Sequence, residues 1–266
     1  MSRSEIEPMI AAAAVIGDCR RELAARSRNI IGEVLGDRGA SEWKHYPDGE
    51  VYDPTSHAQY FYHLHPGRDR SIREHGHFHT FLRADGMPIG MAPLILPEIA
   101  VADAPELPRQ APPLKHGIRE EVSHLIAIAV DLRGEPIRLF TTNRWVTGET
   151  WYRADDVIRI LDRFAISAIV PSRTLNRWVS AMLRLFRPQI ATALRMRDEN
   201  VMAWRRRHRT YVLEDPALEI TSSVEISLET QLAFLDRVRS EPSSKAPHRV
   251  PVLPAMADGW DEDHAG

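Results

Sequence analysis

Two short segments in the middle of the chain place histidines at alternate positions, and this pattern constrains the fold more than any other feature. Residues 57–65 (HAQYFYHLH) and 75–83 (HGHFHTFLR) are rich in aromatic residues and are bounded by turn-forming residues, which is typical of β-strands. Because strand side chains alternate between two faces, each segment has a histidine face and an opposite face suited to a core. The histidines at odd positions are His57, His63, His65, His75, His77 and His79.

We expect the two segments to pair as an antiparallel hairpin through residues 66–74. A register that keeps both histidine faces on one side of the sheet places His63 opposite His77 and extends to His65 opposite His75. Directly opposed Cβ atoms lie about 4.5–5.5 Å apart, so the imidazoles can converge on one ion. A register shifted by one residue turns one histidine set to the other face.

This arrangement predicts a transition-metal site, with iron or zinc as the expected ion. Neutral imidazole binds both metals well, and three such ligands leave coordination positions open for water, substrate or dioxygen. A carboxylate from Asp69, Glu74 or the Glu120–Glu121 pair can complete a two-histidine, one-carboxylate set. The candidate metal ligands are His63, His65, His75, His77, His79 and His124.

Glu74 and Tyr62 are the candidate catalytic groups beside these ligands. The spacing matches neither the His-Glu-x-x-His motif nor the His-x-His-x-Asp-His motif, so the prediction depends on the density and alternation of the histidines. Three alternatives remain open: haem with one histidine as axial ligand and phenylalanines against the macrocycle, a hydrogen-bonded polar cavity without metal, and a solvated strand face.

Two further polar segments are candidates for binding. Residues 141–149 (TTNRWVTGE) are unusually polar for a strand end, and Asn143 and Arg144 are candidate substrate-binding residues, since arginine binds carboxylates well. Polar contacts to neighbouring loops are the alternative. Residues 205–209 form a basic run that is better explained by a helix C-terminus than by nucleic-acid binding.

The order of the predicted elements favours an α+β fold with a central antiparallel sheet or partial barrel flanked by helices. We expect a single domain over 1–239, followed by a disordered tail over 240–266. The domain consists of an N-terminal helix over 4–36, a loop over 40–56, a strand-rich middle over 57–146 and a mostly helical part over 155–239, with short strands near 210–213 and 219–226.

Composition limits the class of protein. The formal net charge is −3, which gives no general attraction to nucleic acid or anionic membranes. Cys19 is the single cysteine, so an intrachain disulfide is impossible and a cytoplasmic location fits best. No apolar stretch approaches the length of a membrane span. The oligomeric state is not readable from the sequence.

The stretch from Trp43 to Arg83, together with Phe140 to Trp151, resembles an uncharacterised family of bacterial proteins, a domain of unknown function. The resemblance implies a bacterial source and carries over no catalytic residue. From the residues alone, the leading hypothesis is a metal-dependent enzyme, an oxidoreductase or oxygenase acting on a small molecule. The alternatives are a non-catalytic haem- or metal-binding protein and a metal-free module that binds a small molecule.

Overall fold

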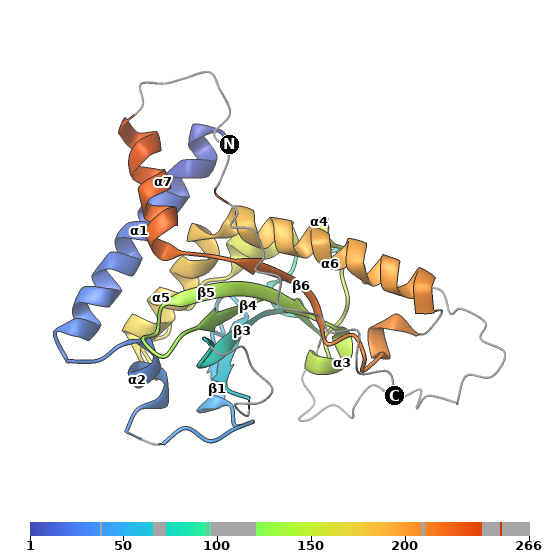
Figure 1. Ribbon diagram of the computed structural model, residues 1–266, viewed down its shortest axis with the longest axis horizontal. Coiled ribbons are helices and arrows are strands. Elements are labelled where there is room, and N and C mark those ends of the chain that lie inside the picture. The colour runs from blue at the N-terminus through green and yellow to red at the C-terminus, as the bar shows by residue number, and fades with distance from the viewer. Residues whose placement is uncertain are drawn as a thin grey trace.

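A computed structural model describes residues 1–37, 39–65, 73–94, 96, 121–208, 211–240 and 251 of the chain. The fold is α+β, with a six-stranded open sheet whose strands follow one another in chain order (Figure 1). Every neighbouring pair of strands is antiparallel. The strands are β1 (Tyr46–Tyr52), β2 (Ala58–His63), β3 (Gly76–Arg83), β4 (Val122–Val130), β5 (Pro136–Thr142) and β6 (Ile220–Glu225).

Helices cover one face of this sheet, and Figure 1 shows α4, α5 and α6 lying over it. The α1 and α7 helices lie side by side beyond the end of the sheet, and α1 also packs on α5. The helices are α1 (Arg3–Ala24), α2 (Ile30–Leu35), α3 (Arg144–Thr147), α4 (Ala154–Ile160), α5 (Arg173–Leu185), α6 (Arg187–His208) and α7 (Leu228–Ser240).

The main hydrophobic core lies between the sheet and these helices. The even-numbered residues of β2 and β3 face it, as the alternation predicts, and Tyr60 and Phe78 are completely buried there. The Tyr60 hydroxyl donates to Asn176 Oδ1 of α5 at 2.6 Å, and the Phe78 ring packs 5.5 Å from that of Trp178. The histidines within these strands, His63, His77 and His79, therefore lie on the opposite face of the sheet.

The α1–α2 region and the segment after it differ from the sequence prediction. The single helix predicted over 4–36 is two helices, because the side chain of Asn29 accepts a hydrogen bond from Gly32 N and begins α2. The loop predicted over 40–56 contains β1. Pro47 and Gly49 indicate a turn, yet both fit here because β1 is an edge strand with an irregular register.

Two later predictions also need correction. The strand-rich middle predicted over 57–146 ends at Thr142, because Asn143 caps the short α3 helix. The strand predicted near 210–213 is wrong for the residues described there, because Val212–Glu214 forms a 3-10 turn. Residues 241–250 and 252–266 of the predicted tail lie outside the described residues, and the single domain over 1–239 stays a prediction.

The described helices include none that is both long and apolar enough to cross a membrane.

Gly76 provides a test of how tightly the β2–β3 hairpin is packed. A Cβ atom at this position would lie 2.5 Å from Tyr62 Oη and 2.6 Å from the carbonyl oxygen of His63. We expect Gly76→Ala to lower the free energy of unfolding by about 1–3 kcal/mol, as overpacked sites do. Urea denaturation measures this change.

Gly17 is the matched control, because it lies in α1 with only a flexible arginine side chain near its Cβ position. Gly17→Ala should raise the free energy of unfolding by about 0.5–1 kcal/mol through helix propensity. Equal effects of the two substitutions would contradict the close approach of Tyr62 to Gly76.

Candidate metal centre

The register of β2 and β3 is the one that the alternation of histidines predicts. His63 is paired directly with His77, and Phe61 with His79. Both histidine sets consequently face the same side of the sheet, and His63, His77 and His79 are all buried. The predicted hairpin with a common histidine face is therefore confirmed.

Three of these histidines come together closely enough to share an ion. Each of His63, His65 and His77 offers a ring nitrogen, and these nitrogens all lie within 4.8 Å of one another. The His63 ring centroid lies 4.9 Å from that of His65 and 4.5 Å from that of His77. The rings of these two pairs stand nearly perpendicular, at 87° and 84°. Two imidazoles from paired strands and a third from His65, just after β2, thus meet over one small volume.

Glu74 fixes the orientation of the His77 ring by contacting Nδ1, the ring nitrogen that is farther from His63. The Nδ1 atom of His77 lies 2.6 Å from Glu74 Oε1, and Arg138 Nη2 donates to Glu74 Oε2 at 2.6 Å. In a neutral His77 ring, the proton then sits on Nδ1 and the lone pair on Nε2, which faces His63 Nε2 at 2.6 Å. A carboxylate behind a histidine in this way is the usual support of a metal-bound imidazole.

The surroundings of His63 favour the neutral form of its ring, which is the form that binds a metal. Burial of the ring, together with the neighbouring histidines, lowers the pKa of His63 to about 2, so the ring is neutral at physiological pH. Burial alone raises the pKa of Glu74, but its hydrogen bonds to His77 and the charge of Arg138 outweigh this effect and lower the pKa to about 2. The site therefore contains a neutral ligand next to an ionised carboxylate, and metal binding displaces no proton from His63.

His79 and His124 form a second pair beside the first group. Their Nδ1 and Nε2 atoms lie 3.1 Å apart, and the His79 ring centroid is 4.8 Å from that of His77. His124 reaches this face because the register of β3 and β4 shifts between Thr80 and Phe81. That bulge leaves Leu125 without a partner in the ladder and turns His124 toward His79.

Glu149 is a buried carboxyl group near His124. Its Oε2 atom accepts a hydrogen bond from the His124 backbone N–H at 2.8 Å, while Oε1 has no hydrogen-bond partner within the described part of the chain. Burial raises the pKa of Glu149 to about 8, and the positive charge of Arg197 only partly offsets this. The Glu149 side chain is thus neutral at pH 7.

The structure places His75 and Tyr62 apart from the three-histidine group. The β2–β3 ladder begins with His63 and His77, so alternation no longer fixes the direction of His75. The His75 ring turns toward Tyr62, and its Nδ1 lies 2.6 Å from the Tyr62 hydroxyl. Tyr62 belongs to the helix-covered core. The predicted pairing of His65 with His75, and the role of Tyr62 at the metal, are therefore not supported by the geometry.

The other predicted residues have structural partners. Asn143 caps α3 and donates to Val212 O at 2.7 Å, and Arg144 forms an ion pair with Glu214. No contact among the described residues joins either side chain to the histidines. Glu121 is exposed. Asp69 and Glu120 lie outside the described residues.

Three residues of the site were not predicted. Arg138 shares a strand face with Phe140 and could have been found from that spacing. The His45 ring stacks on Phe61 at 3.7 Å, and the Trp43 ring lies 4.4 Å from that of His65. Neither was a candidate site residue, because both fall in the loop predicted over 40–56.

The model of one protein family, described as a domain of unknown function (DUF6969), matches residues 10–226. No curated protein and no solved structure matches the chain.

The raised pKa of Glu149 makes the free energy of unfolding depend on pH. Its pKa in the folded protein, about 8, lies above the ordinary value of 4.5, so the unfolded chain releases a proton that the folded chain retains. The wild type therefore loses stability as pH rises from 4.5 to 8. Glu149→Gln keeps the acceptor for His124 N–H and removes this loss.

We expect the stability gained by Glu149→Gln to grow by up to about 1.4 kcal/mol per pH unit across that window. Urea denaturation at several pH values measures the gain. Glu199→Gln, at an exposed position of α6, is the control and should show no such trend. A gain that is the same at pH 5 and pH 8 would show that Glu149 is ionised in the folded protein.

Proposed function

The chain belongs to this family of unknown function, and we propose that it is a metal-dependent enzyme whose ion is bound by His63, His65 and His77. One observation carries the proposal: ring nitrogens of three histidines in and next to the β2–β3 pair lie within 4.8 Å of one another. Without an ion, His63 and His77 share one hydrogen bond between their Nε2 atoms at 2.6 Å, and a neutral imidazole has only one acceptor nitrogen to offer a metal. A cation at the centre satisfies all three lone pairs together.

The surroundings support a bound ion in a second way. Glu74 lies behind His77 and is itself held by Arg138. This arrangement keeps the His77 Nε2 lone pair directed at His63 and the shared volume, and it makes the imidazole a stronger ligand. Because the Glu74 charge is already balanced by Arg138, three neutral ligands leave the positive charge of the ion largely uncompensated. Such an ion is a strong Lewis acid for whatever fills its open positions.

We infer that this ion supports redox chemistry. An oxygenase reaction is the most specific form of this proposal. Imidazole ligands suit both iron and zinc. The rings of Phe61, Phe140 and His79 lie around the ligands, with Phe61 5.2 Å from His79 and Phe140 4.9 Å from His77. Aromatic surroundings of this kind exclude water and suit dioxygen and an apolar substrate more than a hydrolytic water.

Metal content tests the binding half of the proposal. We expect purified protein loaded with iron(II) or zinc(II) to retain one ion per chain after desalting, measured by elemental analysis. His63→Ala and His77→Ala should each abolish retention. His75→Ala is the matched control, since His75 faces Tyr62, and it should retain the ion. Loss of metal from all three variants alike, or no metal in the wild type, would contradict the site. A Soret band would indicate haem instead.

Glu74→Gln tests the orienting role of the carboxylate. The amide keeps the shape of the side chain but removes the charge that holds His77 and Arg138. We expect metal affinity to fall about 10–100-fold, as it does when such supporting groups are replaced. Competition with a chelator measures the affinity, and circular dichroism verifies that the variant is folded. Unchanged affinity would mean that His77 does not bind the ion through Nε2.

An open coordination position distinguishes an enzyme from a metal carrier. Nitric oxide is a stable substitute for dioxygen at ferrous iron. We expect the iron(II)-loaded protein to bind nitric oxide and to give the electron paramagnetic resonance signal of a high-spin iron–nitrosyl. If the protein holds iron but gives no such signal, the iron has no open coordination position, and the oxygenase assignment would then be wrong.

A further inference from the structure

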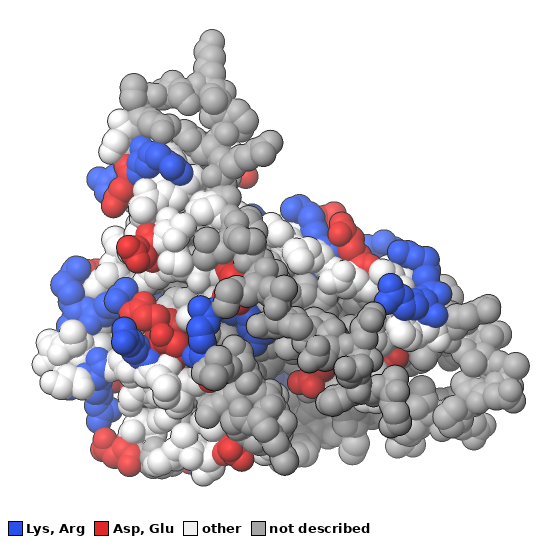
Figure 2. Space-filling model, in the orientation of Figure 1, with Lys and Arg blue, Asp and Glu red and all other residues white. Residues whose placement is uncertain are grey.

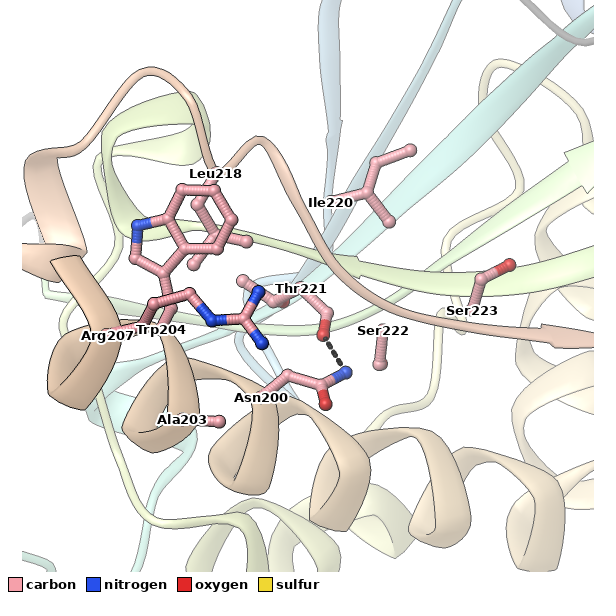
Figure 3. A pocket seen from close by; sticks show the side chains of 9 residues that line it. All are labelled: Asn200, Ala203, Trp204, Arg207, Leu218, Ile220, Thr221, Ser222 and Ser223. Carbon is pink, nitrogen blue, oxygen red and sulfur yellow. Dashed lines mark hydrogen bonds between the residues drawn. The ribbon is translucent and has the colours of Figure 1, made fainter. Parts of the chain in front are cut away.

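A cavity of about 320 Å³ lies between α6 and β6, and it shares no lining residue with the histidine group (Figure 3). Its volume falls within the range of sites for small ligands, which begins at about 300 Å³. The side chains that line it come from one helix on one side and from the β6 segment on the other. They are Asn200, Ala203, Trp204, Arg207, Leu218, Ile220, Thr221, Ser222 and Ser223.

The helical wall of the cavity is one continuous stripe of α6. Asn200, Ala203, Trp204 and Arg207 follow the three- and four-residue spacing that places side chains on the same face of a helix. Ala203 stands in the middle of this stripe, and its small side chain leaves the space between its larger neighbours open. The hollow therefore follows from the sequence of the helix, with Trp204 and Arg207 at one end and Asn200 at the other (Figure 3).

The opposite wall supplies hydroxyl groups. Ser222 and Ser223 lie on β6, where Asn200 Nδ2 also donates to Thr221 O at 2.9 Å. The Thr221 hydroxyl lies 2.8 Å from that of Thr141. This hydrogen bond connects the β6 wall of the cavity to β5. The cavity thus has polar donors along both walls and apolar surface from Trp204, Leu218 and Ile220.

The charge of the cavity is positive. Arg207 is a cation, and no aspartate or glutamate is among the lining residues. Elsewhere on α6, Arg187 pairs with Asp162 and Arg195 with Asp155, whereas Arg207 has no ion pair with any described residue. Figure 3 shows its guanidinium directed back over the cavity, between the Asn200 and Thr221 side chains.

Arg207 belongs to a basic cluster at the end of α6. The last turn of this helix carries Arg205, Arg206, Arg207 and His208, and Figure 2 shows basic side chains gathered over that end. Positive charge at a helix C-terminus offsets the partial negative charge of the free carbonyls. That effect accounts for the cluster as a whole but does not account for a guanidinium placed over a cavity.

We propose that this cavity binds a small organic anion, a carboxylate or phosphate carried on an apolar ring. Arg207 binds the anionic group, as guanidinium binds carboxylate and phosphate through two parallel hydrogen bonds. Asn200 Nδ2 and the Ser223 hydroxyl donate to the remaining oxygens, since the Thr221 and Ser222 hydroxyls are both hydrogen-bonded to Thr141. Trp204, Leu218 and Ile220 pack against the ring.

Calorimetric titration of the full chain with four probes tests this assignment. The probes are benzoate, phenyl phosphate, inorganic phosphate and the neutral benzyl alcohol. We expect one or both ring-bearing anions to bind at least about tenfold more tightly than the alcohol, since a hydrogen bond to a charged group contributes that much or more. The stronger of benzoate and phenyl phosphate identifies the anionic group, and weaker binding of inorganic phosphate shows that the ring contributes.

Two variants and one matched control place the binding in the cavity. Arg207→Gln should weaken binding of the ring-bearing anion about tenfold or more, and Ala203→Phe should abolish it by filling the space. Arg206→Gln makes the same change in net charge at an exposed residue that does not line the cavity, and it should bind like the wild type.

Three results would overturn the assignment. The wild type binds no probe, or it binds the alcohol as tightly as the anions, or Arg206→Gln and Arg207→Gln weaken binding equally. Because the cavity and the histidine group share no residue, metal content is unaffected by any of these variants, and the two proposals fail separately.

Discussion

The direct pairing of His63 with His77 is the constraint on which the rest of the site depends. A slip of one residue between β2 and β3 would turn one histidine set into the helix-covered core, where Tyr60 and Phe78 now lie. The large apolar residues of the even face make that slip costly, because they would have to leave the core. Packing on one face of the sheet thus fixes the position of the polar groups on the other face.

Two buried carboxyl groups near the histidines have different protonation states at neutral pH because their hydrogen-bond partners differ. Glu74 has hydrogen bonds from both His77 and Arg138 and stays ionised. Glu149 accepts one backbone N–H and keeps its proton at neutral pH. Burial without enough donors favours the neutral form of an acid. The charge of the site is therefore concentrated behind His77, where it supports a ligand for a cation.

Alternation was enough to predict the hairpin and its register, because every histidine of β2 and β3 is at an odd position and the even positions carry Tyr60, Tyr62 and Phe78. The α+β class followed from the order of the predicted elements. It was not enough for His124, which reaches His79 only through a bulge that no local pattern reveals. His75 follows the alternation but lies beyond the ladder and turns to Tyr62. The β1 strand was missed because Pro47 and Gly49 are turn residues that an edge strand tolerates. Long-range pairing decides each of these cases.

X-ray absorption spectroscopy of the iron- or zinc-loaded protein tests the central claim most directly, because it reports the atoms bound to the ion. Imidazole ligands at His63, His65 and His77 predict three nitrogen neighbours at about 2.0–2.1 Å with the outer-shell scattering of histidine rings. Replacing His63 should remove one of these rings or the ion itself. A first shell of oxygen atoms alone, or a spectrum that the His63 and His77 substitutions leave unchanged, would show that the ion binds elsewhere.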